Sequence, residues 1–237
     1  MPNIALLSDA EARHLAATGA LFVVRPVVPQ PRPLGENSWT WEWFEYYLSD
    51  DAMAKRLLKA PSPLGAPGDV LVCKEAWLHT GLGYKYRVSD PQWGKTCHWR
   101  PASTMPAWAV RFRPVVREAG VMRAGDIPGK DAEAMGLDVA AKLPAFPPMG
   151  VDIDALVDMV GKQVLAAYWN RRFRKYPWED NPWVWTAVVE AAREYVRFRY
   201  VHGINDRQYR QEVLREKHDK IVEAVNALER HRRGEWE

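Results

Sequence analysis

One carboxylate, Glu75, lies inside an apolar stretch of the sequence that ends at Trp77. A charged side chain in such surroundings is rarely without a partner, because removing it from water unpaired is costly. Glu75 is therefore either a paired or solvent-facing strand carboxylate, or a buried acceptor that faces a cleft and receives a base N–H. The expected partner is Arg25, and such a pair would be structural first and ligand-facing second.

A second stretch, residues 99–108, mixes rings with polar side chains, among them Arg100, Ser103 and Trp108. In a binding protein, rings stack on bases while guanidinium and hydroxyl groups hold phosphates or base edges. The alternative is a proline-rich turn whose tryptophans fill one end of the fold. Because the chain has 12 tryptophans, and aromatic side chains dominate protein cores in general, both interpretations stay open.

A third stretch is basic: Arg171, Arg172, Arg174 and Lys175 surround Phe173. Such a run can follow a phosphate backbone. More commonly it is a solvated surface that complements the C-terminus of a helix. Since the net charge is only +3, we expect any nucleic-acid binding to be weak, salt-sensitive and dependent on stacking.

The sequence does not indicate a metal, a cofactor, a disulfide or a membrane segment. The six histidines are dispersed, and Cys73 and Cys97 have no ligand-spaced neighbours. Residues 1–20 carry charges where a signal peptide would be apolar, and no later run is long enough to cross a bilayer. These features predict a protein of the reducing cytoplasm.

The elements that must position these side chains are short. Ser8, with Glu11 three residues later, predicts a capped helix that Gly19 ends. β-Branched and alternating segments bounded by Pro and Gly predict strands at residues 20–28, 69–77, 84–88, 109–117 and 183–190. In the last of these, Trp183 and Trp185 share one face and are expected in the core.

Helical spacing predicts two short helices within residues 41–58, a short helix at 131–135, and a longer one that begins at Asp152 or Asp154 and reaches the basic run. A charged helix is expected at about 205–233, and its apolar stripe is expected to pack on the body of the protein. Because strands and helices do not alternate as βαβ units, the fold class is predicted to be α+β with a small mixed β-barrel.

Several motifs follow one another along the chain: residues 19–31, 67–77, Tyr86-Arg87 with an acidic turn, 99–109, Asp126-Ile127 with Asp131-Ala132 and Gly136, and 178–185. In this order they resemble the ASCH-like proteins of the PUA-like superfamily that tailed bacteriophages and prophages encode. The resemblance covers residues 4–190. It implies a PUA/ASCH-like barrel with an inter-strand cleft, related to modules that bind RNA or modified nucleobases.

The resemblance also sets the expected domain organisation. Residues 1–190 would form the barrel domain, with helical inserts at 39–60 and 140–175. Residues 191–237 lie outside the resemblance and would form a C-terminal helical extension.

The chain departs from this family where the family does its chemistry. ASCH amidohydrolases remove an acyl group from a modified cytidine with a Lys base, a Thr nucleophile and a Glu. At the matching positions this sequence has Leu21 and Val24, while the Glu position falls at or beside Met135. Because Leu cannot take a proton and Val has no hydroxyl, we predict no catalytic residues at this site.

The leading hypothesis is a catalytically silent binding protein for RNA, single-stranded DNA or a modified nucleobase. Its ligand residues would be Arg25, Glu75, Trp77, Arg100, Ser103 and Trp108, and its phosphate-backbone residues Arg171, Arg172, Arg174 and Lys175. A second hypothesis is a hydrolase with relocated residues Lys74, Glu75 and Glu133. A third is an interaction protein that binds a phage or host protein through its added helices, in particle assembly or against host defence.

Overall fold

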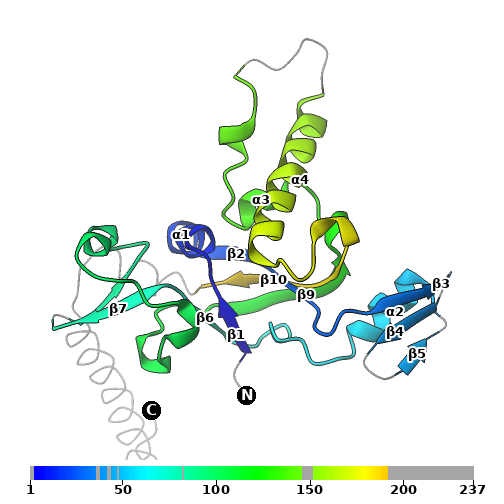
Figure 1. Cartoon of the computed structure of the whole chain (residues 1–237), viewed down its shortest axis with the longest axis horizontal. Helices are drawn as coiled ribbons and strands as arrows, with labels where there is room; N and C mark the ends of the chain where they lie inside the picture. The colour runs from blue at the N-terminus through cyan, green and yellow to red at the C-terminus, as the bar shows by residue number, and fades with distance from the viewer. Residues whose placement is uncertain are drawn as a thin grey trace, which may run out of the picture.

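The computed structural model describes residues 3–35, 38–41, 44–46, 48–81, 83–145 and 152–191, and these form an α+β structure (Figure 1). Along the chain the helices and strands are β1 (Asn3–Leu6), α1 (Asp9–Thr18), β2 (Ala20–Pro26), β3 (Arg32–Gly35), β4 (Ser38–Trp41), β5 (Phe44–Tyr46), α2 (Asp50–Leu57), β6 (Leu71–Lys74), β7 (Trp77–Thr80), β8 (Gly83–Tyr86), β9 (Val115–Arg123), α3 (Asp131–Ala134), α4 (Ile153–Arg172) and β10 (Trp183–Glu190). Short 3₁₀ turns punctuate the segment between β8 and β9.

Helix α1 begins and ends where the sequence predicts. The Ser8 hydroxyl accepts from the backbone N–H of Glu11, and the Glu11 carboxylate accepts from the Ser8 N–H, which is a complete capping box. Gly19 ends the helix in the left-handed conformation at φ 77°. The second predicted cap is also confirmed, because the Asp152 side chain accepts from the first turn of α4.

The centre of the fold is the antiparallel sheet β2-β10-β9. Strand β10 has the predicted bounds, and Trp183 and Trp185 are buried on its core face as expected. The opposite face is covered by α3 and α4 (Figure 1), which pack a second apolar cluster around Trp169 and Val184. Both faces of β10 are therefore buried, which explains its almost uninterrupted apolar sequence.

Strand β6 pairs in parallel with β1, and bridges at its two ends join this pair to β9 and to the residues just before β9. Val70 forms a bridge with Val115, and Cys73 forms one with Phe112. The described strands nevertheless fall into separate sheets, β1-β6, β2-β10-β9, β3-β4-β5 and β7-β8, and do not close. The α+β class is confirmed, and the closed barrel is not.

The prediction of two helices within residues 41–58 is wrong for its first half. Strands β4 and β5 form a hairpin there, and only α2 is helical. Trp39 and Trp41 are both buried, with Thr40 between them half-exposed, which is the period of a strand. Trp39 packs edge-on against Trp183 at a centroid distance of 5.9 Å, so a distant tryptophan selects the strand.

Two other predicted strands are displaced. Residues 69–77 divide into β6 and β7, with Glu75 and Ala76 between them, and the strand expected at 109–117 begins only at Val115. Pro114 has no N–H to donate, and its carbonyl accepts from Leu71 instead. In this segment Arg111 is buried, whereas Arg113 is exposed.

The predicted short helix at 131–135 is confirmed as α3, and the long helix as α4, which ends at Arg172. The charged helix expected at 205–233 lies outside the described residues.

Candidate functional site

Glu75 is buried, but its partner is Arg111 and not the predicted Arg25. The Arg111 Nε and Nη2 atoms donate to the two Glu75 carboxylate oxygens at 2.6 and 2.9 Å. The same guanidinium donates to Ser89 Oγ at 2.6 Å and lies 4.5 Å from the centroid of the Tyr86 ring. Because this bidentate pair uses both carboxylate oxygens inside the protein, Glu75 serves the fold.

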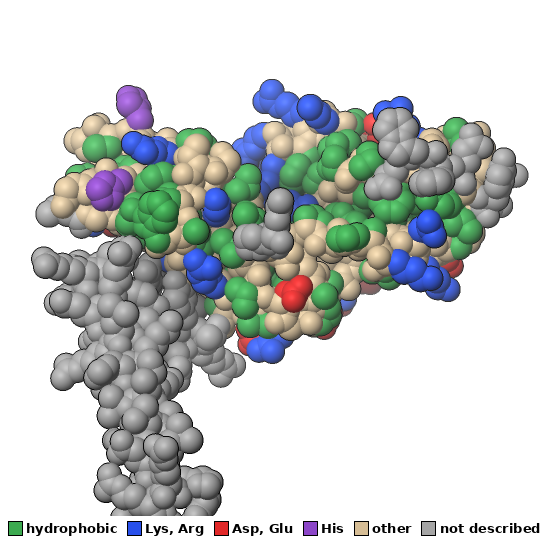
Figure 2. Space-filling model, turned by 90° about the horizontal axis from the view of Figure 1, so that it is seen from below, with side chains coloured by type: hydrophobic (Ala, Val, Ile, Leu, Met, Phe, Trp, Pro, Cys, Tyr) green, Lys and Arg blue, Asp and Glu red, His purple; other side chains and the backbone are tan. Residues whose placement is uncertain are grey.

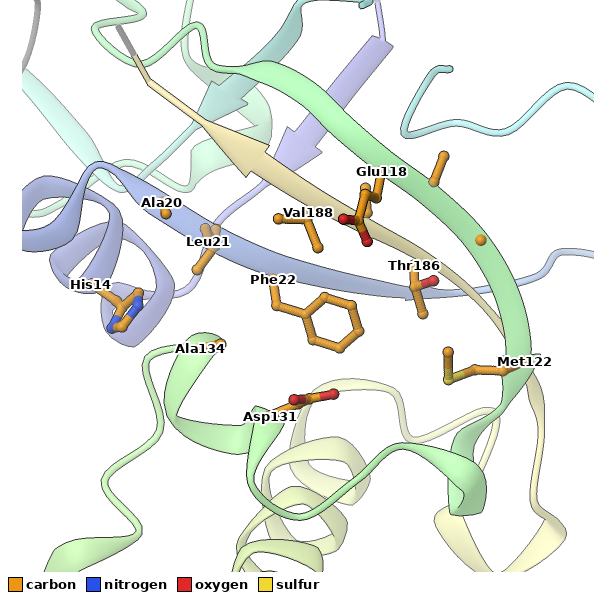
Figure 3. Close-up of a pocket in the computed structure, with 13 residues that line it drawn as sticks. His14, Ala20, Leu21, Phe22, Glu118, Met122, Asp131, Ala134, Thr186 and Val188 are labelled. Atoms are coloured by element: carbon orange, nitrogen blue, oxygen red, sulfur yellow. The ribbon is translucent and has the colours of Figure 1, made fainter. Parts of the chain in front are cut away.

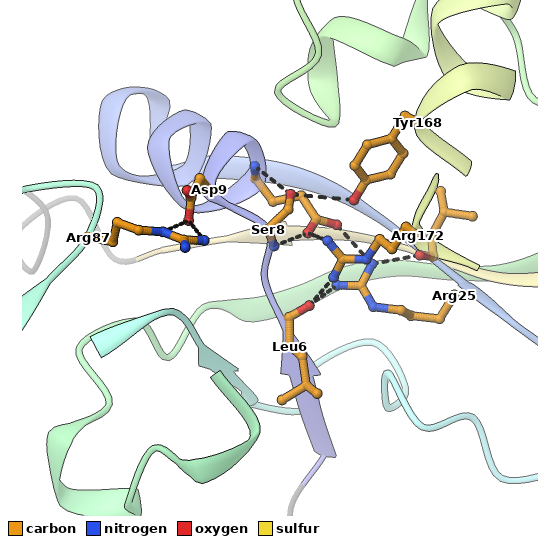
Figure 4. A network of polar contacts seen from close by, with 9 residues as sticks. Leu6, Ser8, Asp9, Arg25, Arg87, Tyr168 and Arg172 are labelled. Atoms are coloured by element: carbon orange, nitrogen blue, oxygen red, sulfur yellow. Dashed lines mark hydrogen bonds and ion pairs between the residues drawn. The ribbon is translucent and has the colours of Figure 1, made fainter. Parts of the chain in front are cut away.

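Arg25 belongs to a different buried network, centred on Glu11 (Figure 4). The Glu11 carboxylate is fully buried, accepts a hydrogen bond from Arg25 Nη1 at 2.8 Å and forms an ion pair with Arg172 Nη1 at 2.9 Å. Both guanidinium groups also donate to the backbone carbonyl of Leu6. This network joins β1, α1, β2 and the end of α4.

The opposite charges in this network shift the pKa values of Glu11 and Arg25. Burial alone would raise the pKa of Glu11, but the positive charges of Arg25 and Arg172 outweigh it and hold the pKa below its usual value. Burial would lower the pKa of Arg25, and the Glu11 carboxylate raises it instead. Glu11 and Arg25 are therefore both charged at neutral pH.

Arg172 therefore cannot contact a phosphate as the basic run predicted, because it is paired with Glu11. Its side chain is mostly buried against Glu11, and its guanidinium lies 5.7 Å from the Tyr168 ring. Arg171, Arg174 and Lys175 are exposed, as expected for a solvated helix end.

Three of the predicted ligand residues do come together, and they do so around a residue that the prediction omitted, Tyr84. The Trp108 Nε1 donates to the Tyr84 hydroxyl at 2.6 Å. The Tyr84 ring lies 5.8 Å from the Trp77 ring, and the Arg100 guanidinium lies 5.2 Å from Trp77. With His79, whose ring is 4.9 Å from Tyr84, these five residues define the Trp108 surface.

The hairpin β7-β8 positions the inner part of this surface. Trp77 pairs with Tyr86 and His79 with Tyr84, so all four rings project from one face. Trp77 also exchanges two backbone hydrogen bonds with Arg100, at 2.8 and 3.2 Å, which joins the hairpin to the 100–110 loop. Trp77 itself is buried and supports the surface from beneath.

Trp108 and the cationic groups around it are accessible. The Trp108 side chain is 65% exposed, so it does not fill the end of the fold. Arg113 donates to the carbonyl of Ala107, the residue before Trp108, at 2.9 Å. Arg100 and Arg113 are both exposed, and within the described part of the chain neither forms an ion pair. Ser103 is exposed in the same loop.

The positions that match the family's catalytic residues are packed in the interior. Leu21, Val24 and Met135 are each at most 1% exposed. The relocated set is not assembled either, because Glu75 is held by Arg111 while Glu133 acts electrostatically on His14 on α1. Among the described residues, no group of three His, Cys, Asp or Glu side chains could hold a metal ion.

The sequence contained a signal for Tyr84, since it alternates with Tyr86 in a predicted strand. No signal identified Arg111 as the partner of Glu75, because that contact depends on the bridge between Cys73 and Phe112. In the described part of the chain, no helix combines the length and apolarity needed to span a membrane.

Compared with known proteins, the chain matches no family model, no curated sequence and no solved structure.

Proposed function

We propose that this protein binds unstacked bases of RNA or single-stranded DNA, including modified bases, on the Trp108 surface. In this proposal the protein is an ASCH-like binding protein, and it does not remove acyl groups from modified cytidine.

The observation that carries the proposal is the fixed, exposed ring of Trp108. A large apolar ring in water is unfavourable, and here its only polar atom is bonded to Tyr84 at 2.6 Å. That bond limits the rotation of the indole, so little side-chain entropy is lost when a base stacks on it. Base stacking on such a ring contributes about 1–3 kcal/mol.

The charges around Trp108 suit the same ligand. Arg100 lies 5.2 Å from the Trp77 ring that supports this surface, and Arg113 donates to the carbonyl of Ala107, the residue before Trp108. A phosphate beside a stacked base would find guanidinium groups that are already exposed and have no carboxylate to displace. Figure 2 also shows basic side chains spread over one face of the molecule, with few acidic ones among them.

One observation favours the interaction-protein alternative. Ile4, Leu6 and Val70 are 40–49% exposed near the β1-β6 pair. Register places Ile4 opposite Val72, so Ile4, Leu6 and Val70 share the outer face of this pair. Neighbouring exposed apolar residues of this kind mark protein interfaces when they form a large patch.

The test is binding of labelled RNA and DNA oligomers of about ten nucleotides, a length within the usual range for one small domain. Fluorescence anisotropy at two salt concentrations would be compared for wild type, Trp108→Ala and Arg100→Ala. We expect Trp108→Ala to lose about 1–3 kcal/mol of binding at both salts. Arg100→Ala should reduce the logarithmic salt slope by about 0.7 for each lost phosphate contact.

Trp93→Ala is the matched control for the ring. Trp93 contacts Lys85, whose register position places it on the opposite face of the β7-β8 hairpin. Arg32→Ala is the control for charge, since Arg32 is exposed on β3 and belongs to neither predicted ligand set. If no oligomer binds at low salt, or if Trp108→Ala binds as wild type does, the interaction-protein alternative replaces this proposal. An N4-acetylcytidine oligomer incubated with the protein should remain acetylated.

A further inference from the structure

A separate pocket of about 510 Å³ lies between the central sheet and helices α1 and α3 (Figure 3). Its floor comes from β2, β9 and β10, and its walls come from α1 and α3. It lies on the α3 side of the sheet, whereas the Trp108 surface is built on the β7-β8 hairpin. The volume lies within the range of small-molecule sites, about 300–1,000 Å³.

The floor of the pocket is apolar. Phe22 and Val188 are register partners on neighbouring strands, and Met122 follows on β9. Gly120 lies between these side chains and leaves the centre open, because a β-carbon there would lie 2.8 Å from Thr186 Oγ1. A ring or short aliphatic chain could contact Phe22 and Met122 directly.

A buried polar group faces this apolar floor. Thr186 as a residue is only 4% exposed, and no hydrogen bond joins its side chain to any described residue. The close-up places it inside the pocket (Figure 3). Because Thr186 lines the pocket and its side chain has no partner among the described residues, its hydroxyl is available there to a ligand or water.

The charged groups of the pocket are acidic. In Figure 3 the carboxylates of Glu118 and Asp131 lie on opposite sides of Phe22, and neither forms an ion pair or hydrogen bond with a described side chain. Among the described residues, no Lys or Arg lines the pocket. Burial lowers the pKa of His14, the remaining titratable group, and Glu133 opposes this shift only in part. The pocket is therefore net negative at neutral pH.

We propose that this pocket binds an organic cation with an apolar body, of the arylalkylamine class. The ammonium group would lie between Glu118 and Asp131, the Thr186 hydroxyl would complete its hydrogen bonds, and the ring would pack on Phe22 and Met122. Carboxylates only accept hydrogen bonds, so the site selects N–H donors and rejects anions.

The experiment is calorimetric titration of the full chain with 2-phenylethylamine and, separately, with 3-phenylpropionate, which has a similar body and the opposite charge. We expect millimolar binding of the amine, as is typical of so small a ligand, and no heat with the carboxylate. Asp131→Asn should weaken amine binding about tenfold, the usual effect of losing a charged hydrogen bond. Ala134→Phe, which adds a ring at an exposed wall position, should abolish it.

Two matched variants keep the result interpretable. Asp154→Asn removes an exposed carboxylate from α4, and Ala140→Phe adds a ring at an exposed position, both outside the pocket lining. Both should bind the amine as wild type does, and thermal unfolding would verify that every variant is folded. The proposal is overturned if the amine gives no heat at 10 mM, a concentration about tenfold above a millimolar Kd. It is also overturned if 3-phenylpropionate binds as well as the amine, or if a folded Ala134→Phe variant still binds the amine. Because oligomer binding is measured separately, failure here leaves the Trp108 surface unaffected.

Discussion

The buried network at Glu11 and the Trp108 surface both contain arginines that the sequence marks as ligand-binding, yet their surroundings differ. Arg25 and Arg172 are bonded to a carboxylate that is fully buried, and they join four elements of the fold. Arg100 and Arg113 remain exposed beside an accessible ring. An arginine whose charge is already neutralised in the interior stabilises the structure, whereas an unpaired one at the surface is available to an anion.

The largest expected effect concerns Glu11. Replacing it with Ala leaves two mostly buried guanidinium groups without their carboxylate and removes half of the α1 capping box. We expect a loss of about 3–5 kcal/mol in the free energy of unfolding, measured by urea denaturation. Glu190→Ala, which removes the exposed partner of Arg117, should cost less than about 1 kcal/mol. Equal losses in the two variants would contradict the distinction between the regions.

A smaller effect is expected from pH. The folded-state pKa of Glu11 is below its usual 4.5, so its ionised form stabilises the protein above that value. This contribution is lost as pH falls through the folded-state pKa. The difference in stability between wild type and Glu11→Gln should be constant from pH 7 to about 5 and should narrow below about pH 4.5. A difference that widens in acid would mean that the carboxylate is not stabilised by its arginines.

The smallest effect concerns the support of Trp108. Tyr84→Phe keeps the ring and removes the hydroxyl that accepts from Trp108 Nε1. Oligomer affinity should fall by about 0.5–1.5 kcal/mol, while the free energy of unfolding changes little because the bond is exposed. Tyr176→Phe is the control, since its hydroxyl bonds to no described residue. Unchanged oligomer binding in Tyr84→Phe would show that Trp108 does not need this anchor.

The predictions from sequence are confirmed where they depend on residues that are close together along the chain. The Ser8 and Asp152 caps, the Gly19 stop and the bounds of β10 depend on residues a few positions apart. The predictions are wrong where the structure depends on a contact with a residue that is far away in the sequence. In the hairpin that replaces the expected helix Trp39 packs against Trp183, and just beyond the end of β6 the Glu75 carboxylate is held by Arg111.

The same division holds for the two sites. The sequence by itself determined that rings and arginines are concentrated at 99–108 and that Leu21 and Val24 cannot act as base and nucleophile. Only the tertiary structure decided that Arg25 pairs with Glu11 and that Glu75 pairs with Arg111. It also decided that Tyr84 accepts a hydrogen bond from Trp108 and that Thr186 lines a pocket. Side-chain chemistry is written in the residue type, but whether a group is paired, buried or free depends on which segments the fold brings beside it.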